Sequence, residues 1–345
     1  MTNATSIIGH AALTPAGPTP ADLLAACREG RDIPCETQDR APGANHRFRS
    51  IGHMLSDPRL RHPRLRRAPT VARLAVSAAL DALDAASIDA TPRGGSRVGV
   101  VFALMNACVA YSNRFFGEVL ADPATASPIL FPETVYNAPA SHLSALLGQT
   151  APNYTLIGDT GVFAAALQTA RLWLAAGQCD FVVVATAEEH DWLTAEAPGL
   201  LHHNIPMAEA AAALVLAKPD DSRTPVARLE ALTSARAITG RAQRAEAMRA
   251  ARRELEANGP LPDDALLVTS SSGNLTDTRD DDAAWAGFAG PRLAPLPVIG
   301  HPFGATAGVQ FALAVEALRT GIAREAVVSA AGNNHQVVMA RVVAG

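Results

Sequence analysis

Short apolar runs alternate along the chain with longer stretches in which apolar residues recur every three or four positions. The short runs contain almost no polar residues, as in strands that are covered on both faces of a sheet. The longer stretches are alanine-rich and helical in period. This alternation predicts an α/β protein. Strands are predicted at 97–104, 180–187, 210–217, 265–271 and 325–332, and helices at 70–86, 163–177, 241–259 and 311–321.

Two stretches share one order of features: a turn of small residues, a helix that ends in glycine, and an apolar strand. They are residues 160–187 and 304–331, and aligning them on their helix-ending glycines places Thr160 opposite Gly304. The repeat predicts two similarly built halves, residues 1–218 and 219–345, packed as one compact unit. Two alanine-rich helices followed by strands can also look alike by chance.

Composition narrows the class of protein. With 345 residues, 48% of them hydrophobic, the chain can bury a large core. A net charge of −4 provides no basic field for nucleic acid. The apolar runs fall short of the ~20 residues that cross a bilayer, and residues 1–15 lack the features of a signal peptide. Four cysteines without a C-x-x-C pair fit a reduced protein. We therefore expect a cytoplasmic protein without nucleic-acid or membrane partners.

Five segments carry small-residue motifs in a fixed order along nearly the whole chain. In that order they resemble segments of the β-ketoacyl synthases of the thiolase-like superfamily. The resemblance implies an α/β, five-layered αβαβα fold built from two pseudo-duplicated halves, with surface loops shorter than usual. The segments are SIIGHAALTPAGPTPADLLAACREGRD (6–32), PNYTLIGDT to ATAEE (152–189), MAEAAAALVLAK (207–218), VIGHPFGATAG (298–308) and SAAGNNHQVVMARV (329–342).

The resemblance implies a condensing cysteine at a helix N-terminus, where the dipole lowers its pKa. Counting without gaps forward from Pro152 and back from Asp180 gives Thr160 at that position. A threonine hydroxyl is a poor substitute, because the helix dipole contributes only ~0.3–1 kcal/mol and Asp159 disfavours an alkoxide. Thr160 is interpreted as a polar pocket-filler or a helix N-cap, with a threonine nucleophile as the alternative.

The family's two catalytic histidines and its oxyanion loop are implied at three further places. Ser272 stands at the first histidine position, and His301 keeps the second. The family's Gly-Phe-Gly-Gly loop, one of whose N–H groups completes the oxyanion hole, aligns with Ala330-Ala331-Gly332-Asn333, so its gating phenylalanine becomes Ala331.

Other family features are absent or ambiguous. The family lysine is missing, since Leu296 and Pro297 occupy that stretch, whereas Glu209 of the family's Gly-Glu-Gly segment is kept. The serines at 270–272 suggest a nucleophile, but without a base motif beside them we interpret them as a polar strand-to-loop transition. His301 is interpreted as structural, with catalysis or thioester binding as the alternatives.

The replaced positions predict a non-catalytic homologue without cofactor or metal, like the chain-length factors of type II polyketide systems, including those that make aryl polyenes. The resemblance implies a heterodimer with an active ketosynthase, through which an acyl carrier protein is engaged. Residues 131–148 are expected at the interface and tunnel wall, unless they form an ordinary loop and helix. The alternatives are a malonyl-carrier decarboxylase or acyl-thioester transferase that uses His301, and a homodimeric acyl-binding protein.

Two polar features stay open. The basic run DPRLRHPRLRR (57–67) is either solvated surface or a surface that steers an acidic carrier protein. His202 and His203 form a pair that would need further ligands to bind a metal, so we interpret them as part of a loop.

Overall fold

The fold is that of a computed structural model, which describes residues 4–41, 44–91, 94–201, 205–257, 259–332 and 336–345. Two five-stranded halves form its centre, and both have the same strand order and the same directions. In each half the three parallel strands lie at one side and two antiparallel strands follow. The first half contains β5 (Asn153–Ile157), β4 (Val98–Leu104), β6 (Phe181–Glu188), β8 (Ala210–Ala217) and β1 (Thr5–Leu13), in that spatial order.

The second half repeats this order with its own strands. They are β12 (Arg292–Leu293), β11 (Leu266–Val268), β13 (Glu325–Ala331), β14 (Gln336–Ala344) and β9 (Ala227–Leu232), and β10 (Arg236–Ala237) pairs with β14. Antiparallel pairing of Thr5–Ile7 with Ala227–Leu229 joins the two halves into one sheet path. The predicted duplication is confirmed in the fold, whereas the division at residue 218 remains a prediction.

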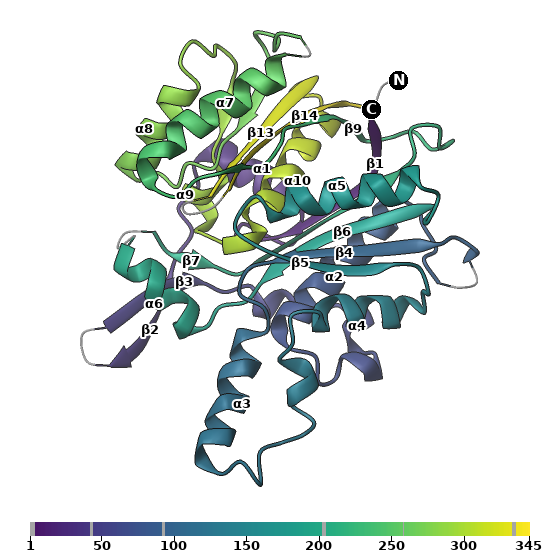
Figure 1. The fold of residues 1–345 in the computed structure, drawn as a ribbon, viewed down its shortest axis with the longest axis vertical. Helices are drawn as coiled ribbons and strands as arrows, with labels where there is room; N and C mark the ends of the chain where they lie inside the picture. Colours follow the sequence, from purple (N-terminus) through teal and green to yellow (C-terminus); the bar gives the residue numbers. More distant parts are fainter. Residues whose placement is uncertain (1–3, 42–43, 92–93, 202–204, 258, 333–335) are drawn as a thin grey trace.

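Helices form three layers around these sheets, so that the five-layered arrangement is confirmed (Figure 1). The middle layer contains α5 (Val162–Ala175) and α10 (Thr306–Arg319), whose Phe163 and Phe311 rings lie 5.7 Å apart. Residues 306–318 of α10 are all buried, as expected for a helix that is packed on every side. The outer layers are α2 (Thr70–Ala85) with α4 (Ala138–Leu147), and α7 (Arg244–Glu256) with α8 (Leu275–Ala284).

The remaining elements lie around the two five-stranded halves and their helix layers. Helix α3 (Val109–Ala121) projects from this body beside the first half (Figure 1). A small sheet pairs β2 and β3 with β7. These elements are α1 (Pro20–Glu29), β2 (Glu36–Ala41), β3 (Ala44–Arg49), α3 (Val109–Ala121), α6 (Trp192–Leu201), β7 (Met207–Ala208) and α9 (Pro295–Ile299), with short 3₁₀ turns η1 (Gly52–Met54), η2 (Pro58–Arg61), η3 (Pro63–Leu65), η5 (Phe131–Glu133), η6 (Arg241–Gln243) and η7 (Phe303–Ala305).

The predicted elements are found, most of them with bounds that differ from the prediction by one to three residues, and two of the differences bear on the site. Helix α10 begins at Thr306 rather than at 311, because Gly308 lets the helix approach β6 closely: a Cβ there would lie 2.4 Å from the methyl of Thr186. Strand β11 ends at Val268 rather than at 271. The polar residues that follow it are used for hydrogen bonds, as described below.

Candidate functional site

Thr160 lies in the turn between β5 and α5, and it is buried. Its hydroxyl donates to the Asp159 carboxylate at 3.3 Å. The N-cap of α5 is Gly161, with no side-chain capping bond, so the N-cap interpretation of Thr160 is wrong. The hydroxyl therefore has an acidic neighbour and no basic one among the hydrogen bonds of the described residues, which does not favour its deprotonation.

The Ala331–Gly332 end of β13 lies against this turn. A Cβ on Gly332 would stand 1.7 Å from an Asp159 oxygen, so a larger residue there would force the Asp159 side chain to move. The Ala331 N–H, at the predicted oxyanion position, donates to the Ser270 hydroxyl at 3.0 Å. The Gly332 N–H donates to the Gln336 carbonyl at 2.9 Å. Both backbone donors of this loop are thus already occupied. Asn333 lies outside the described residues.

Arg244 holds the same two residues from the other side. Its guanidinium donates to the carbonyls of Ala331 and Gly332, each at 3.3 Å, and it pairs with Asp280 at 3.4 Å. The arginine is only 1% exposed. Sequence reasoning missed both Arg244 and the role of Ser270. The signal for Arg244 is its place on the buried stripe of α7, four residues before Met248 and seven before Ala251.

Ser272, at the predicted first histidine position, is a buried donor to the Asp277 carboxylate. Asn274, the N-cap of α8, also donates to Asp277, at 3.0 Å. The serines of residues 270–272 therefore belong to the strand-to-loop transition that was predicted. No hydrogen bond or ion pair joins Ser272 to Thr160 among the described residues.

His301 is fixed mainly through its backbone, which forms a bridge with β7. The His301 N–H donates to the Pro206 carbonyl at 2.9 Å, and the His301 carbonyl accepts from Ala208 at 3.1 Å. Its ring nitrogen Nδ1 accepts from the Phe303 N–H at 3.1 Å, and the two rings meet edge to face. These contacts support the structural interpretation of His301.

Two consecutive buried carboxylates lie at the end of β6. Glu188 accepts from the N–H groups of Met105 and Asn106, and burial raises its pKa to about 8 despite these bonds. Glu189 accepts from the N–H groups of Val71 and Ala110, and burial raises its pKa to about 7. These carboxylates tie neighbouring loops to β6, so we assign them a structural role.

Glu188 predicts a specific dependence of stability on pH. Its folded pKa lies above its unfolded value of about 4.3, so the folded chain binds more protons and the free energy of unfolding falls as the pH rises from about 5 to 8. Glu188→Gln should remove part of this slope, and chemical denaturation at several pH values would measure it. Glu246→Gln, at an exposed ion pair, is the control. Parallel profiles for wild type and Glu188→Gln would refute the assignment.

Glu209 and the basic run also have defined positions. Glu209 accepts from the N–H groups of Ile51, Gly52 and His190, at 2.8, 3.1 and 3.2 Å, which agrees with a packing role.

In the basic run, Arg59 is held by three aspartates, whereas the other four arginines are exposed and have no salt bridge among the described residues. They are Arg61, Arg64, Arg66 and Arg67. His202 and His203 lie outside the described residues.

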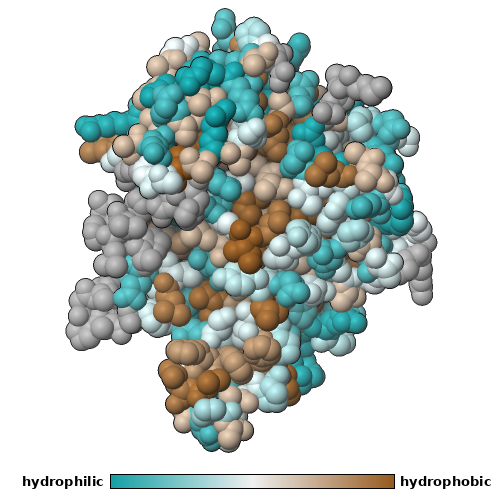
Figure 2. All heavy atoms as spheres, in the orientation of Figure 1, coloured by the Kyte–Doolittle hydropathy of each residue, from teal (hydrophilic) through white to brown (hydrophobic). Residues whose placement is uncertain are grey.

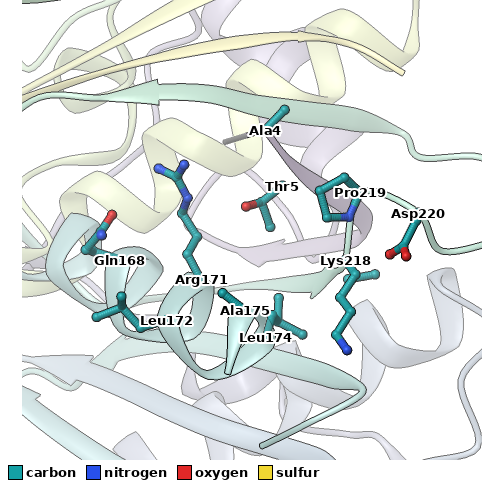
Figure 3. A pocket seen from close by; sticks show the side chains of 11 residues that line it. Ala4, Thr5, Gln168, Arg171, Leu172, Leu174, Ala175, Lys218, Pro219 and Asp220 are labelled. Atoms are coloured by element: carbon teal, nitrogen blue, oxygen red, sulfur yellow. The ribbon is translucent and has the colours of Figure 1, made fainter. Parts of the chain in front are cut away.

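A cavity of about 340 Å³ opens at the far end of α5 (Figure 3). It lies between the second half of α5, the start of β1 and the end of β8, where Arg171 and Lys218 extend in opposite directions. Helix α5 spans 14 residues, about 21 Å. The cavity is therefore separated from Thr160 by much of the helix and is not part of the same site.

Comparison with known proteins fits this geometry. Residues 3–196, more than half of the chain, match the family model of the beta-ketoacyl synthase N-terminal domain. The chain belongs to the β-ketoacyl synthase family. In this family member the five-layered fold and the strand–turn–helix around Thr160 are retained. No curated protein matched the chain significantly.

Solved structures confirm that this family member has the thiolase-like fold. An ishigamide ketosynthase/chain length factor has a TM-score of 0.82 at 18% identity, with 99% of each chain covered. A β-ketoacyl synthase from Burkholderia phymatum STM815 has a TM-score of 0.81 at 16% identity, with both chains fully covered. The structure of a type II polyketide synthase acyl-carrier protein in complex with its ketosynthase has a TM-score of 0.83 at 12% identity, and both chains are fully covered. No helix in the described part of the chain is long and apolar enough to cross a membrane.

Proposed function

We propose that this chain is a catalytically degenerate ketosynthase homologue that acts as a chain-length-factor-like subunit. It pairs with an active ketosynthase in polyketide or fatty-acid-like biosynthesis. The condensation takes place in the partner, and an acyl carrier protein is engaged through that partner. The chain needs no cofactor or metal in this role.

One observation carries the proposal: the backbone donor at the predicted oxyanion position already makes a hydrogen bond within the chain. The Ala331 N–H already donates to Ser270, while Arg244 holds the adjacent carbonyls. A transition-state oxyanion needs preorganised donors that are free to reach it. Thr160 at the nucleophile position and Ser272 at the first histidine position support the same conclusion.

The face beside β5 supports a partner subunit. Strand β5 ends the sheet path, and among the described residues no strand pairs with its outer edge. Large apolar side chains are exposed on β5, α3, α5 and the link before α4, and Figure 2 shows apolar surface over the projecting α3 region. An unpaired edge with apolar neighbours is a surface that a second chain can cover. The exposed apolar residues of this face are Phe116, Leu120, Ile129, Phe131, Val135, Tyr136, Tyr154, Ile157 and Leu172.

Co-expression with an active ketosynthase from the same organism, followed by native mass spectrometry, tests the proposal. We expect a 1:1 heterodimer and no condensing activity from this chain alone. A strictly homodimeric chain that ignores the ketosynthase would refute the partner role. Turnover by the chain alone that is lost in His301→Ala would instead establish an enzyme of altered chemistry.

Ile157→Asp should abolish the pairing. Ile157 is 57% exposed, so the chain's own stability should change by less than about 0.5 kcal/mol. A charge placed in an apolar interface is desolvated without a partner, which should weaken association at least about a hundredfold. Native mass spectrometry measures the loss, and Leu275→Asp, at an exposed position on α8, is the control. Equal weakening by both variants would contradict the assignment of the β5 face.

A further inference from the structure

The link between α3 and α4 presents three large apolar side chains to solvent. We define the η5 segment as residues 131–137, which include Phe131, Val135 and Tyr136, all exposed. The segment lies beside the projecting α3 (Figure 1), over which Figure 2 shows apolar surface. Apolar side chains that stay exposed gain no burial free energy in the free chain, so the conformation of the segment there depends on its other bonds.

A polar pair bridges this segment to α4. The Glu133 carboxylate bonds His142 Nε2 at 2.7 Å, and the two side chains are only 15% and 14% exposed. Glu133 lies at the end of η5 and His142 in the middle of α4, so the pair closes the turn between them.

Helix α3 holds the same segment from its other side. The Ser112 hydroxyl donates to the Thr134 carbonyl at 3.2 Å, and the Cys108 thiol donates weakly to the Val135 carbonyl at 3.6 Å. The Phe131 ring packs against Phe115 of α3, with ring centroids 5.5 Å apart. The segment is therefore tied to two helices.

Hydrogen bonds also connect α4 to the edge strand β5. The Asn153 side-chain amide, at the start of β5, donates to the Ala140 carbonyl at 2.9 Å and to the Ser144 hydroxyl at 2.7 Å. These bonds join α4 to β5. The η5 segment, α4 and the free edge of β5 thus form one connected surface.

We infer that the Glu133–His142 pair is a positioning device that holds the η5 segment in the conformation in which it meets the partner ketosynthase. The inference rests on the proposed pairing. A segment that is ordered before association loses less conformational entropy when it binds, so preorganisation strengthens association without adding contacts. Without the pair, the apolar side chains would still be present but would have to be ordered during binding.

Three variants and a control test the pair. Glu133→Ala and His142→Ala should each weaken binding to the ketosynthase about tenfold, at a temperature at which melting curves show both free variants to be folded. His142→Gln, whose amide can still donate to Glu133, should bind like wild type. Glu246→Ala, at an exposed pair on α7, is the matched control. Affinity is measured by titration with purified ketosynthase, and hydrogen exchange of the free chain should be faster in residues 131–137 for the two alanine variants alone.

The outcomes separate the inference from the proposed function. If wild type binds and Glu133→Ala binds equally well, the positioning role is overturned while the pairing stands. If His142→Gln is as weak as His142→Ala, the hydrogen bond is not the cause and the inference is also overturned. If wild type does not bind the ketosynthase, the proposed function fails and the inference fails with it.

Discussion

Replacing Thr160 by cysteine is expected to leave the isolated chain without measurable condensing activity. A thiol just before α5 would stand at the predicted nucleophile position, but Ser272 would still stand at the predicted first histidine position and the Ala331 N–H would still donate to Ser270. Loss of one oxyanion donor lowers rates about 10²–10³-fold, and loss of a general acid or base about 10²–10⁴-fold. Together they predict a rate at least about 10⁴-fold below that of an active ketosynthase.

The measurement is a condensation assay with acyl and malonyl carrier-protein thioesters, with an active ketosynthase as the positive control. Mass spectrometry of the peptide that contains residue 160 shows whether the new cysteine is acylated. Acylation without condensation agrees with the account. Condensation by Thr160→Cys within about a hundredfold of the control would show that the other parts of the catalytic machinery are intact.

Removing the guanidinium of Arg244 should destabilise the fold by about 3–5 kcal/mol, the loss typical of breaking a buried charged contact. In Arg244→Ala the carbonyls of Ala331 and Gly332 lose their donors. Asp281, whose pKa burial raises to about 6, loses a nearby positive charge. Urea denaturation followed by fluorescence measures the free energy of unfolding.

Arg253→Ala provides the matched control on the same helix. Arg253 pairs with Glu246 at the surface, and such pairs contribute about 0–1 kcal/mol. A loss of similar size in both variants would show that Arg244 acts only through general helix stability and does not hold the Ala331–Gly332 loop.

The alternation of apolar strands and helices predicted most of the central elements, because buried strands and amphipathic helices are specified by local patterns. The α10 start at Thr306 escaped prediction, since Gly308 disfavours a helix locally but permits its contact with Thr186. Similarly, β11 ends at Val268, and just beyond it the Ser270 hydroxyl accepts from a backbone N–H 61 residues away in sequence, a tertiary contact that no local pattern reveals.

The position of the candidate site could be predicted from the sequence, but the hydrogen bonds that occupy its backbone groups could not. Counting along the sequence placed Thr160 in the turn before α5, and the fold has that turn. The occupation of the Ala331 N–H and the clamp by Arg244 depend on tertiary contacts between residues 61 and 87 positions apart. Only the arginine on the buried stripe of α7 gave a sequence signal, because a buried guanidinium must find acceptors.

The most direct test of the central claim is a reconstitution in which each subunit is disabled in turn. Thr160→Ala in this chain, paired with wild-type ketosynthase, should give product at the wild-type rate, because the proposed function gives Thr160 no part in the chemistry. This chain in wild-type form, paired with a ketosynthase whose condensing cysteine is replaced by alanine, should give none. Product from the second pair, or loss of product from the first, would contradict the account and place the reaction in this chain.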